Sequence, residues 1–197
     1  AGNSGSRYAS PMKSPSRLLA MLFSVLPLWA QAFSGGAPTC HAEDVLESPM
    51  GDPIANMGFS LSATPAQYTP GQAMTLTLSN VDSGVTVRGV LLYVEDPDAL
   101  DDMAMPIKRG NFTAPYPMGI KAVFDGYEGC NFAGLTPVLT HDSSQTKSLP
   151  MTLTWQPPAI DTGDLRVRGI ALLGFNAYQM LSLDLRSINH IFTDSFE

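Results

Sequence analysis

Apolar and polar residues alternate along two stretches of the chain, and this alternation predicts strands. From Leu149 to Trp155, apolar residues occupy every second position, with threonine or proline between them. The stretch from Ala73 to Ser79 alternates in the same way. A period of two residues is typical of a strand that buries one face. Pro157 has no backbone N–H to donate to a neighbouring strand, so we expect the strand that contains Trp155 to end there.

Further stretches have the apolar content and turn-rich borders of strands: residues 59–63, 85–95, 132–140, 165–174 and 178–185. In the last of these, the helix and strand signals are nearly even. The segment 42–47 allows at most one helical turn, because prolines and small residues surround it. Seven or eight short strands separated by turn signals predict an all-β fold, an antiparallel β-sandwich.

Length and charge limit the range of functions. The chain has 197 residues, 44% hydrophobic and 15% charged, which is enough for one sizeable core and one domain. The formal net charge is −7, and every acidic residue lies at or after Glu43. Such a surface repels phosphate backbones and anionic lipid headgroups, so we expect no nucleic-acid partner.

The first 32 residues predict export. Residues 12–17 form a short basic region, residues 18–29 an apolar run, and Ala30-Gln31-Ala32 a small-x-small cleavage site. We therefore expect a signal peptide over residues 12–32, cut after Ala32, and an unpatterned extension over residues 1–11. A membrane anchor is the alternative, but the apolar run is short for a span. The mature chain contains no other segment long enough to cross a membrane.

The two cysteines, Cys40 and Cys130, fit an oxidising compartment. An even pair in an exported chain is most simply a disulfide, whereas redox and metal sites favour close spacings such as C-x-x-C. We expect a structural bridge.

Residues 95–102 place five carboxylates next to a strand and raise the question of a calcium site. The candidate ligands are Asp96, Asp98, Asp101 and Asp102. The run has neither the central glycine nor the closing glutamate of an EF-hand loop, so the simpler interpretation is a solvated acidic loop without metal. Asn111 begins a glycosylation sequon, which has meaning only in a host that glycosylates exported chains.

Catalytic and cofactor motifs are not evident in the sequence. His41, His141 and His190 are scattered and lack the close partners of the common zinc motifs. Ser143 and Ser144 follow His141 and Asp142, but catalytic partners usually converge through the fold and not through adjacency. We predict a protein that is not an enzyme and carries no cofactor. Weak candidates for ligand binding are Tyr116, Tyr127 and His141.

Several short motifs, taken in order, resemble a reeler domain over about residues 35–185. They are Gly36-Ala37-Pro38-Thr39-Cys40, Tyr68-Thr69-Pro70-Gly71, Arg88-Gly89-Val90-Leu91-Leu92-Tyr93, Gly110-Asn111-Phe112, Cys130, Thr140-His141-Asp142 with Lys147, and Thr154-Trp155-Gln156-Pro157-Pro158. The resemblance implies an immunoglobulin-like β-sandwich, here assigned to residues 33–187 with a tail over 188–197, and a Cys40–Cys130 disulfide. Reeler domains begin reelin and spondin-type matrix proteins, occur in ferric-chelate-reductase-like membrane proteins, and stand alone in small secreted defence proteins that bind microbial surfaces.

Two functional hypotheses follow. The first is a secreted, non-catalytic binding or adhesion module whose partner is an extracellular protein or a glycan of the matrix or of a microbial surface. The last residues resemble the Phe-Glu endings of some exported proteobacterial proteins, and in a bacterium the location would be the periplasm or the medium. The alternative is a redox- or metal-handling accessory that uses His141, the methionines or the acidic run. The larger reeler proteins add haem-binding modules or membrane helices, which are not expected here.

Overall fold

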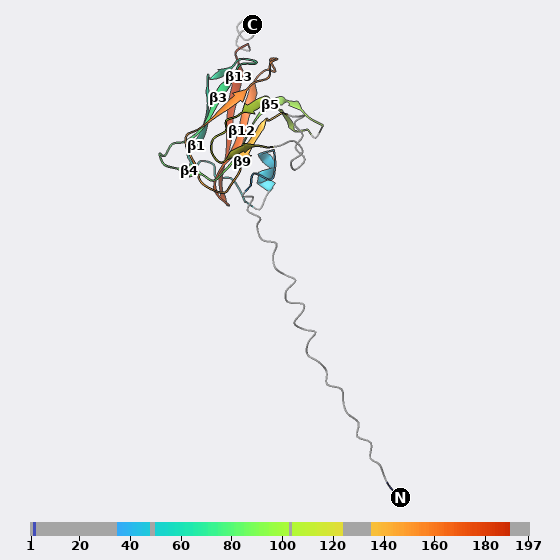
Figure 1. The fold of residues 1–197 in the computed structure, drawn as a ribbon. Helices are drawn as coiled ribbons and strands as arrows, with labels where there is room; N and C mark the ends of the chain where they lie inside the picture. Colours follow the sequence, from blue (N-terminus) through green and yellow to red (C-terminus); the bar gives the residue numbers. More distant parts are fainter. Residues whose placement is uncertain (1, 3–34, 48–49, 103, 124–134, 190–197) are drawn as a thin grey trace. The chain divides into compact units, whose positions relative to one another are not determined.

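The computed structural model describes residues 2, 35–47, 50–102, 104–123 and 135–189 (Figure 1). Apart from Gly2, these all belong to one unit, residues 32–197. The described part of that unit contains thirteen strands and one short 3₁₀ helix, η1 (Glu43–Glu47), and it has no α-helix. The all-β prediction is therefore confirmed. No helix among the described residues has the length and apolar character needed to cross a membrane.

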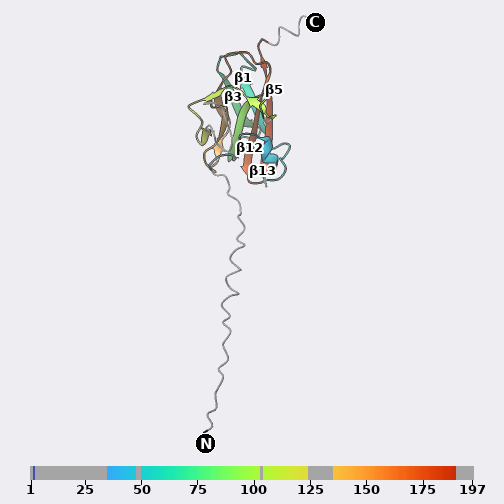
Figure 2. The same ribbon diagram turned by 90° about the vertical axis from the view of Figure 1, so that its right-hand side faces the viewer.

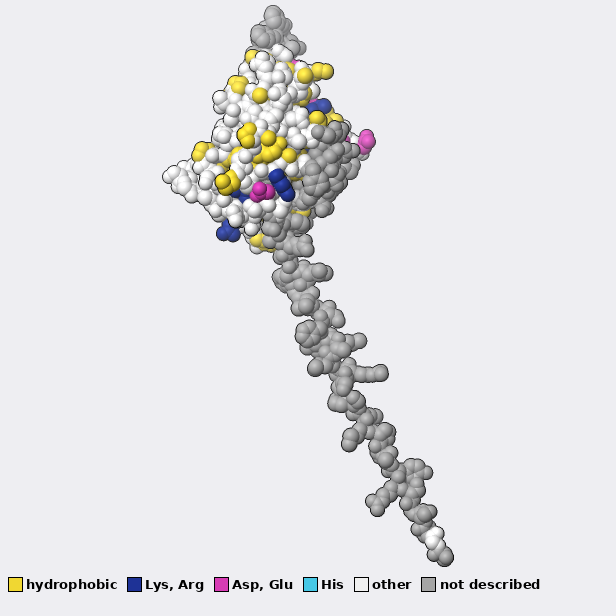
Figure 3. All heavy atoms as spheres, in the orientation of Figure 1, with side chains coloured by type: hydrophobic (Ala, Val, Ile, Leu, Met, Phe, Trp, Pro, Cys, Tyr) yellow, Lys and Arg dark blue, Asp and Glu magenta, His cyan; other side chains and the backbone are white. Residues whose placement is uncertain are grey.

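A four-stranded antiparallel sheet contains the two clearly alternating stretches. Its order is β1 (Phe59–Thr64), β3 (Met74–Asn80), β11 (Met151–Gln156) and β7 (Asn111–Thr113). Strands β3 and β11 bury their apolar residues and turn their threonines outward, as the alternation predicts. None of the four strands contains a charged residue. Few charged side chains appear on the face of the molecule drawn in Figure 3.

The second sheet has seven strands and is mixed, because β2 pairs with β13 in parallel while the other pairs are antiparallel. Its path is β2 (Gln67–Tyr68), β13 (Ala177–Ser187), β12 (Leu165–Gly174), β5 (Gly89–Leu100), β9 (Val138–His141) and β8 (Ile120–Ala122), with β6 (Pro106–Lys108) beside β5. A two-stranded ribbon joins β4 (Thr86–Val87) to β10 (Lys147–Ser148).

The main core lies between the buried faces of these two sheets. Leu76 and Leu153 of the smaller sheet belong to the same apolar cluster as Leu92 and Val167 of the larger one. Trp155 is fully buried there, and its indole N–H donates to the carbonyl oxygen of Arg109 at 3.2 Å. Burial of a tryptophan ring stabilises the folded state by several kcal/mol, at about 25 cal/mol per Å² of apolar area, provided that the indole N–H keeps a hydrogen-bond partner.

A second apolar cluster covers the large sheet with the segment that precedes β1. Residues 35–47, here called the N-terminal strap, place Ala42 and Val45 against Tyr93 of β5, Ile170 of β12 and Tyr178 of β13. Figure 2 shows the helix η1 of the strap beside β12 and β13. The helix η1 lies in the segment 42–47, where the sequence favours a loop and allows at most one helical turn.

The structure corrects two details of the sequence prediction. The stretch 85–95 is two strands, β4 and β5, because the backbone of Arg88 leaves the strand path and donates to the carbonyl oxygen of Leu172 at 2.8 Å. The strand count exceeds the expected seven or eight because β2, β4, β6, β7, β8 and β10 are only two or three residues long. Such short pieces carry no measurable period, so pattern reasoning does not detect them.

Candidate functional site

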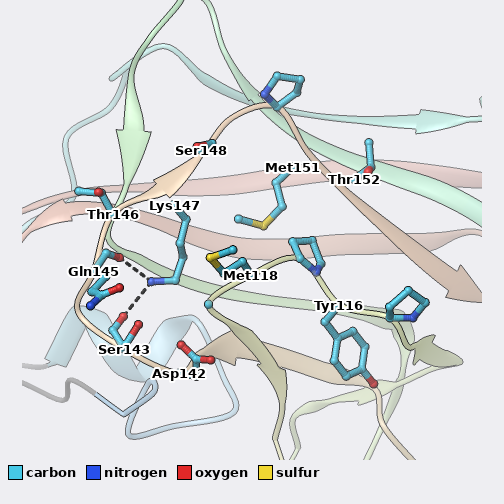
Figure 4. Close-up of a pocket in the computed structure, with 14 residues that line it drawn as sticks. Tyr116, Met118, Asp142, Ser143, Gln145, Thr146, Lys147, Ser148, Met151 and Thr152 are labelled. Atoms are coloured by element: carbon cyan, nitrogen blue, oxygen red, sulfur yellow. Dashed lines mark hydrogen bonds between the residues drawn. The ribbon is translucent and has the colours of Figure 1, made fainter.

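A pocket of about 890 Å³ opens between residues 115–119 and residues 142–152. The first segment connects β7 to β8, and the second follows β9 and includes β10 and the start of β11. Figure 4 shows Ser143, Gln145 and Thr146 on one side of this space and Tyr116 on the other. The two walls are more than twenty residues apart in the sequence, and the pairing of β8 with β9 and of β7 with β11 brings them together.

The two walls are held in register by backbone hydrogen bonds. Ile120 of β8 pairs with His141 of β9, and the N–H of Asp142 donates to the carbonyl oxygen of Gly119 at 2.9 Å. Gly119 has φ +82°, and a Cβ atom at this position would lie 2.8 Å from Cε of Lys147. Glycine is favoured here both by its backbone conformation and by the close approach of the lysine.

Lys147 is buried behind the second wall and stabilises it through hydrogen bonds. Its side chain is buried, and its ammonium donates to the carbonyl oxygens of Arg88 at 2.9 Å, Ser143 at 2.8 Å and Gln145 at 2.8 Å. An ammonium has three N–H donors, so these three carbonyl groups use all of them. Burial lowers the pKa of Lys147, while the charge of Asp142 raises it. The lysine therefore stabilises the hairpin and offers no donor to an anionic ligand.

The first wall supplies an aromatic and apolar surface. Tyr116 is half-buried, and its hydroxyl donates to the carbonyl oxygen of Phe112 at 3.2 Å, which fixes the ring. Prolines flank it on both sides, and the rigid φ of proline limits the loop further. Met118 stands at the rim with 93% of its surface exposed, while Met151 is buried on the opposite segment.

The candidate binding residues predicted from the sequence lie in different places relative to the pocket. Tyr116 lines the pocket. His141 does not line it: the ring is 8% exposed, lies beside Gly89, and has Nδ1 3.3 Å from the backbone nitrogen of Val90. Tyr127, His190 and Cys130 lie outside the described residues. The triad-like run is thus divided, with His141 buried and Asp142 and Ser143 at the pocket surface.

The prediction of a solvated acidic loop over residues 95–102 is wrong for the first half of that segment. Residues 95–100 belong to β5, and both Glu95 and Asp96 are buried. The guanidinium of Arg109 donates to Oδ2 of Asp96 at 2.8 and 3.2 Å, and Arg168 lies 3.7 Å from Glu95. These arginines compensate the loss of hydration that burial imposes on the carboxylates.

Two of the candidate calcium ligands, Asp96 and Asp101, accept hydrogen bonds from the backbone. Oδ1 of Asp96 accepts the N–H of Asp98 at 3.2 Å, and Oδ1 of Asp101 accepts the N–H of Met105 at 2.9 Å; Asp102 is exposed. Within the described ranges, no group of three His, Cys, Asp or Glu residues is placed to hold a metal ion.

Asn111 and Cys40 occupy structured positions. Asn111 is half-buried in β7, and its side-chain oxygen accepts the N–H of Thr136 at 2.8 Å. Cys40 is buried in the N-terminal strap and is disulfide-bonded. Since Cys130 is outside the described residues, the Cys40–Cys130 pairing stays a prediction.

Sequence reasoning missed most of the pocket. The residues before Leu149 are polar and have no period, so the sequence does not indicate that Lys147 is buried. A run in which two prolines flank an aromatic residue is the one local signal that could have marked the first wall, because it predicts a rigid, surface-exposed ring.

Comparisons with known proteins support the fold. The model of the Reeler domain family matches residues 47–178. Among solved structures, the human F-spondin reeler domain (fragment 1) is 15% identical with a TM-score of 0.55, and the match covers 72% of this chain and 97% of that one. The Reelin-N domain of F-spondin is 16% identical with a TM-score of 0.54, covering 74% and 96%. No curated protein matches. Since the family match spans well over half of the chain and these structures share its fold, the chain belongs to the Reeler domain family.

Proposed function

We propose that this chain is a secreted, non-catalytic binding module whose pocket takes an uncharged, polyhydroxylated ligand, namely a glycan of a microbial surface or of the extracellular matrix. The family supports an extracellular-type binding module. The basic, apolar and small-residue pattern of residues 12–32 supports export.

The choice of an uncharged ligand rests on the hydrogen bonds of Lys147, which use all three of its N–H donors. Among the described residues that line the pocket, Lys147 is the only basic one, and its three donors are already used by carbonyl groups. Asp142 adds a negative charge at the rim, which disfavours anions further. Ser143, Gln145 and Thr146 present hydroxyl and amide groups, which are neutral donors and acceptors suited to sugar hydroxyls.

Tyr116 supplies the complementary surface. An aromatic ring beside neutral polar groups resembles the mixture found in many ligand pockets, where apolar contacts give affinity and a few polar groups fix orientation. The hydrogen bond from its hydroxyl to Phe112 holds the ring in place before a ligand arrives, so little side-chain entropy is lost on binding.

Three finer assignments accompany this proposal. The domain is an immunoglobulin-like sandwich over residues 33–187, the leader is removed after Ala32, and Cys40 pairs with Cys130. The intact mass of the exported protein tests the processing step: a mass that begins at Phe33 is expected, and retention of residues 12–32 would indicate an anchor instead.

The binding test uses neutral glycans, charged glycans and lipopolysaccharide, immobilised separately and probed with the purified chain. We expect binding to a neutral glycan that changes little between 50 and 300 mM salt, because no ion pair contributes. Tyr116→Ala should weaken this binding at least tenfold, which corresponds to about 1.4 kcal/mol.

The matched control is Ile160→Ala, which truncates a side chain that is 79% exposed and does not line the pocket. It should bind as the unmodified chain does. Salt-sensitive binding to an acidic glycan, capture of a protein instead of any glycan, or stoichiometric copper, iron or calcium in the purified protein would each contradict the proposal.

A further inference from the structure

The N-terminal strap is held on the large sheet by hydrogen bonds from three different strands. The N–H of Ala37 donates to Oγ1 of Thr140 at 2.7 Å, and the N–H of Ala42 donates to the hydroxyl oxygen of Tyr93 at 2.9 Å. The Tyr93 hydroxyl in turn donates to Glu43 at 3.0 Å, and Glu43 also pairs with Arg168. The strap is thus attached through polar contacts as well as through its apolar side chains.

His41 lies in the middle of this attachment and contacts a lysine. Nζ of Lys108, on β6, is 2.9 Å from Nδ1 and 3.2 Å from Nε2 of His41. The same ammonium stands over the ring of Tyr93, 4.9 Å from its centroid, and the His41 ring meets Tyr93 edge-on. Because an ammonium only donates, the imidazole must accept and must therefore be neutral in this arrangement.

Protonation of His41 would place two positive charges in contact at a half-buried position. The carboxylates that approach His41 are Glu43 and Asp44 of the strap and Asp101 at the end of β5. Glu43 is bound by Arg168 and Tyr93, Asp44 accepts the hydroxyl of Thr39, and Asp101 accepts the N–H of Met105. Each already accepts a hydrogen bond, and together their attraction for a protonated His41 is smaller than the combined effect of burial and Lys108.

We propose that His41 and Lys108 form an acid-sensitive latch, which holds residues 41–47 of the strap on the large sheet at neutral pH and releases them in mildly acidic solution. Cys40, buried and disulfide-bonded, lies directly before the latch, so the release is local. The apolar contacts that the strap makes with Tyr93, Ile170 and Tyr178 are then lost.

The direction of the pH effect follows from proton linkage. Burial, and next the charge of Lys108, lower the pKa of His41 below its ordinary 6.5, while Asp44, Glu43 and Asp101 oppose this. The released strap therefore binds a proton more readily than the docked strap. Docking of the strap is therefore favoured above pH 6.5. As the pH falls below that value, the equilibrium constant for docking decreases by at most about tenfold per pH unit.

Hydrogen exchange of the whole chain at pH 7.5 and pH 5.5, corrected for the intrinsic pH dependence of amide exchange, tests the latch. We expect residues 41–47 to lose protection at pH 5.5 by severalfold more than β3 or β11. His41→Gln should abolish this difference, since glutamine accepts from Lys108 but stays neutral. His141→Gln, which changes a buried histidine of β9, should keep it.

Lys108→Met provides an independent variant if His41→Gln fails to fold. It removes the ammonium, so protonated His41 meets no neighbouring cation, and we expect a smaller pH dependence of the strap than in the unmodified chain, with the part that burial of His41 causes remaining. The proposal is overturned if either variant loses protection in acid as the unmodified chain does, if the unmodified strap exchanges equally at both pH values, or if the His41 ring titrates by NMR at or above pH 6.5.

Discussion

Gly110 shows how a single residue is constrained by the core around it. Its φ of +67° lies in the left-handed region, and a Cβ atom there would lie 2.6 Å from Nε1 of Trp155. The preceding carbonyl group, that of Arg109, accepts the indole hydrogen bond. The turn between β6 and β7 is therefore packed directly against the fully buried ring of Trp155.

Gly110→Ala should lower the free energy of unfolding by about 3 kcal/mol, of which roughly 1 kcal/mol reflects backbone strain and the rest the displacement of Trp155 and of the Gln156 carbonyl oxygen, which would lie 2.5 Å from the added Cβ. Urea unfolding followed by tryptophan fluorescence measures this. Gly84→Ala is the matched control, because Gly84 has φ +88° but nothing lies within 4 Å of its added Cβ. Equal losses in the two variants would show that the contact with Trp155 contributes nothing.

Lys108 is the residue whose ionisation should most affect stability above neutral pH. Burial lowers its pKa from 10.5 to about 8, against the attraction of Glu95 and Asp101. The unfolded chain then binds more protons than the folded chain between pH 8 and 10.5. Stability should rise with pH across this window.

The free energy of unfolding should increase by on the order of 1 to 2 kcal/mol between pH 7.5 and 9.5. The series stops at pH 9.5 because burial raises the pKa of Tyr68, Tyr93 and Tyr178, and their ionisation would destabilise the fold above pH 10. Lys108→Met should reduce the slope but not remove it, since burial also lowers the pKa of Lys147. A flat profile in the unmodified chain would refute this prediction.

At the scale of elements, a buried lysine stabilises the hairpin that forms the second pocket wall. The chain between β9 and β11 has no glycine, and its carbonyl groups at Ser143 and Gln145 converge on the Lys147 ammonium. The same ammonium reaches Arg88 just before β5, so it also ties the hairpin to the large sheet.

Lys147→Met keeps the length of the side chain but leaves three carbonyl groups without their donor. We expect a loss of about 2 kcal/mol in the free energy of unfolding, and a larger local loss of hydrogen-exchange protection in residues 142–148. Lys121→Met, at a half-buried lysine of β8, should cost less than about 1 kcal/mol. If both variants lose the same amount, the convergent carbonyl contacts are not what stabilises the hairpin.

At the scale of the whole molecule, the segment before β1 is integrated into the fold instead of trailing from it. The strap covers one face of the large sheet, and the core between the two sheets lies on the other face. The predicted Cys40–Cys130 bridge would close a loop that contains β1 to β8, which explains why its effect should be global.

Replacing both cysteines with alanine should remove about 2 to 5 kcal/mol and lower the melting temperature by roughly 5 to 15 °C. Calorimetry measures this, and glycan binding well below the new midpoint should be unchanged, because a structural bridge acts mainly on the unfolded chain and Cys40 does not line the pocket. Free thiols in a non-reducing peptide map, or lost binding with unchanged stability, would exclude a purely structural bridge.

The sequence by itself determined the strands whose pattern is local. The alternation in β3 and β11 specifies which side chains are buried, since neighbouring side chains of a strand point to opposite faces wherever that strand is placed. The same reasoning identified Trp155 as a core residue and the all-β class, because neither depends on a distant partner.

Only the tertiary structure decided which residues meet. Burial of Glu95 and Asp96 depends on Arg168 and Arg109, which come from β12 and from the turn after β6. The pocket exists because β8 pairs with β9 and brings Tyr116 opposite Gln145, and the latch exists because the strap brings His41 to Lys108, 67 residues later. A charged or polar side chain is buried only when a partner compensates its lost hydration, and that partner is supplied by the fold, which no local period encodes.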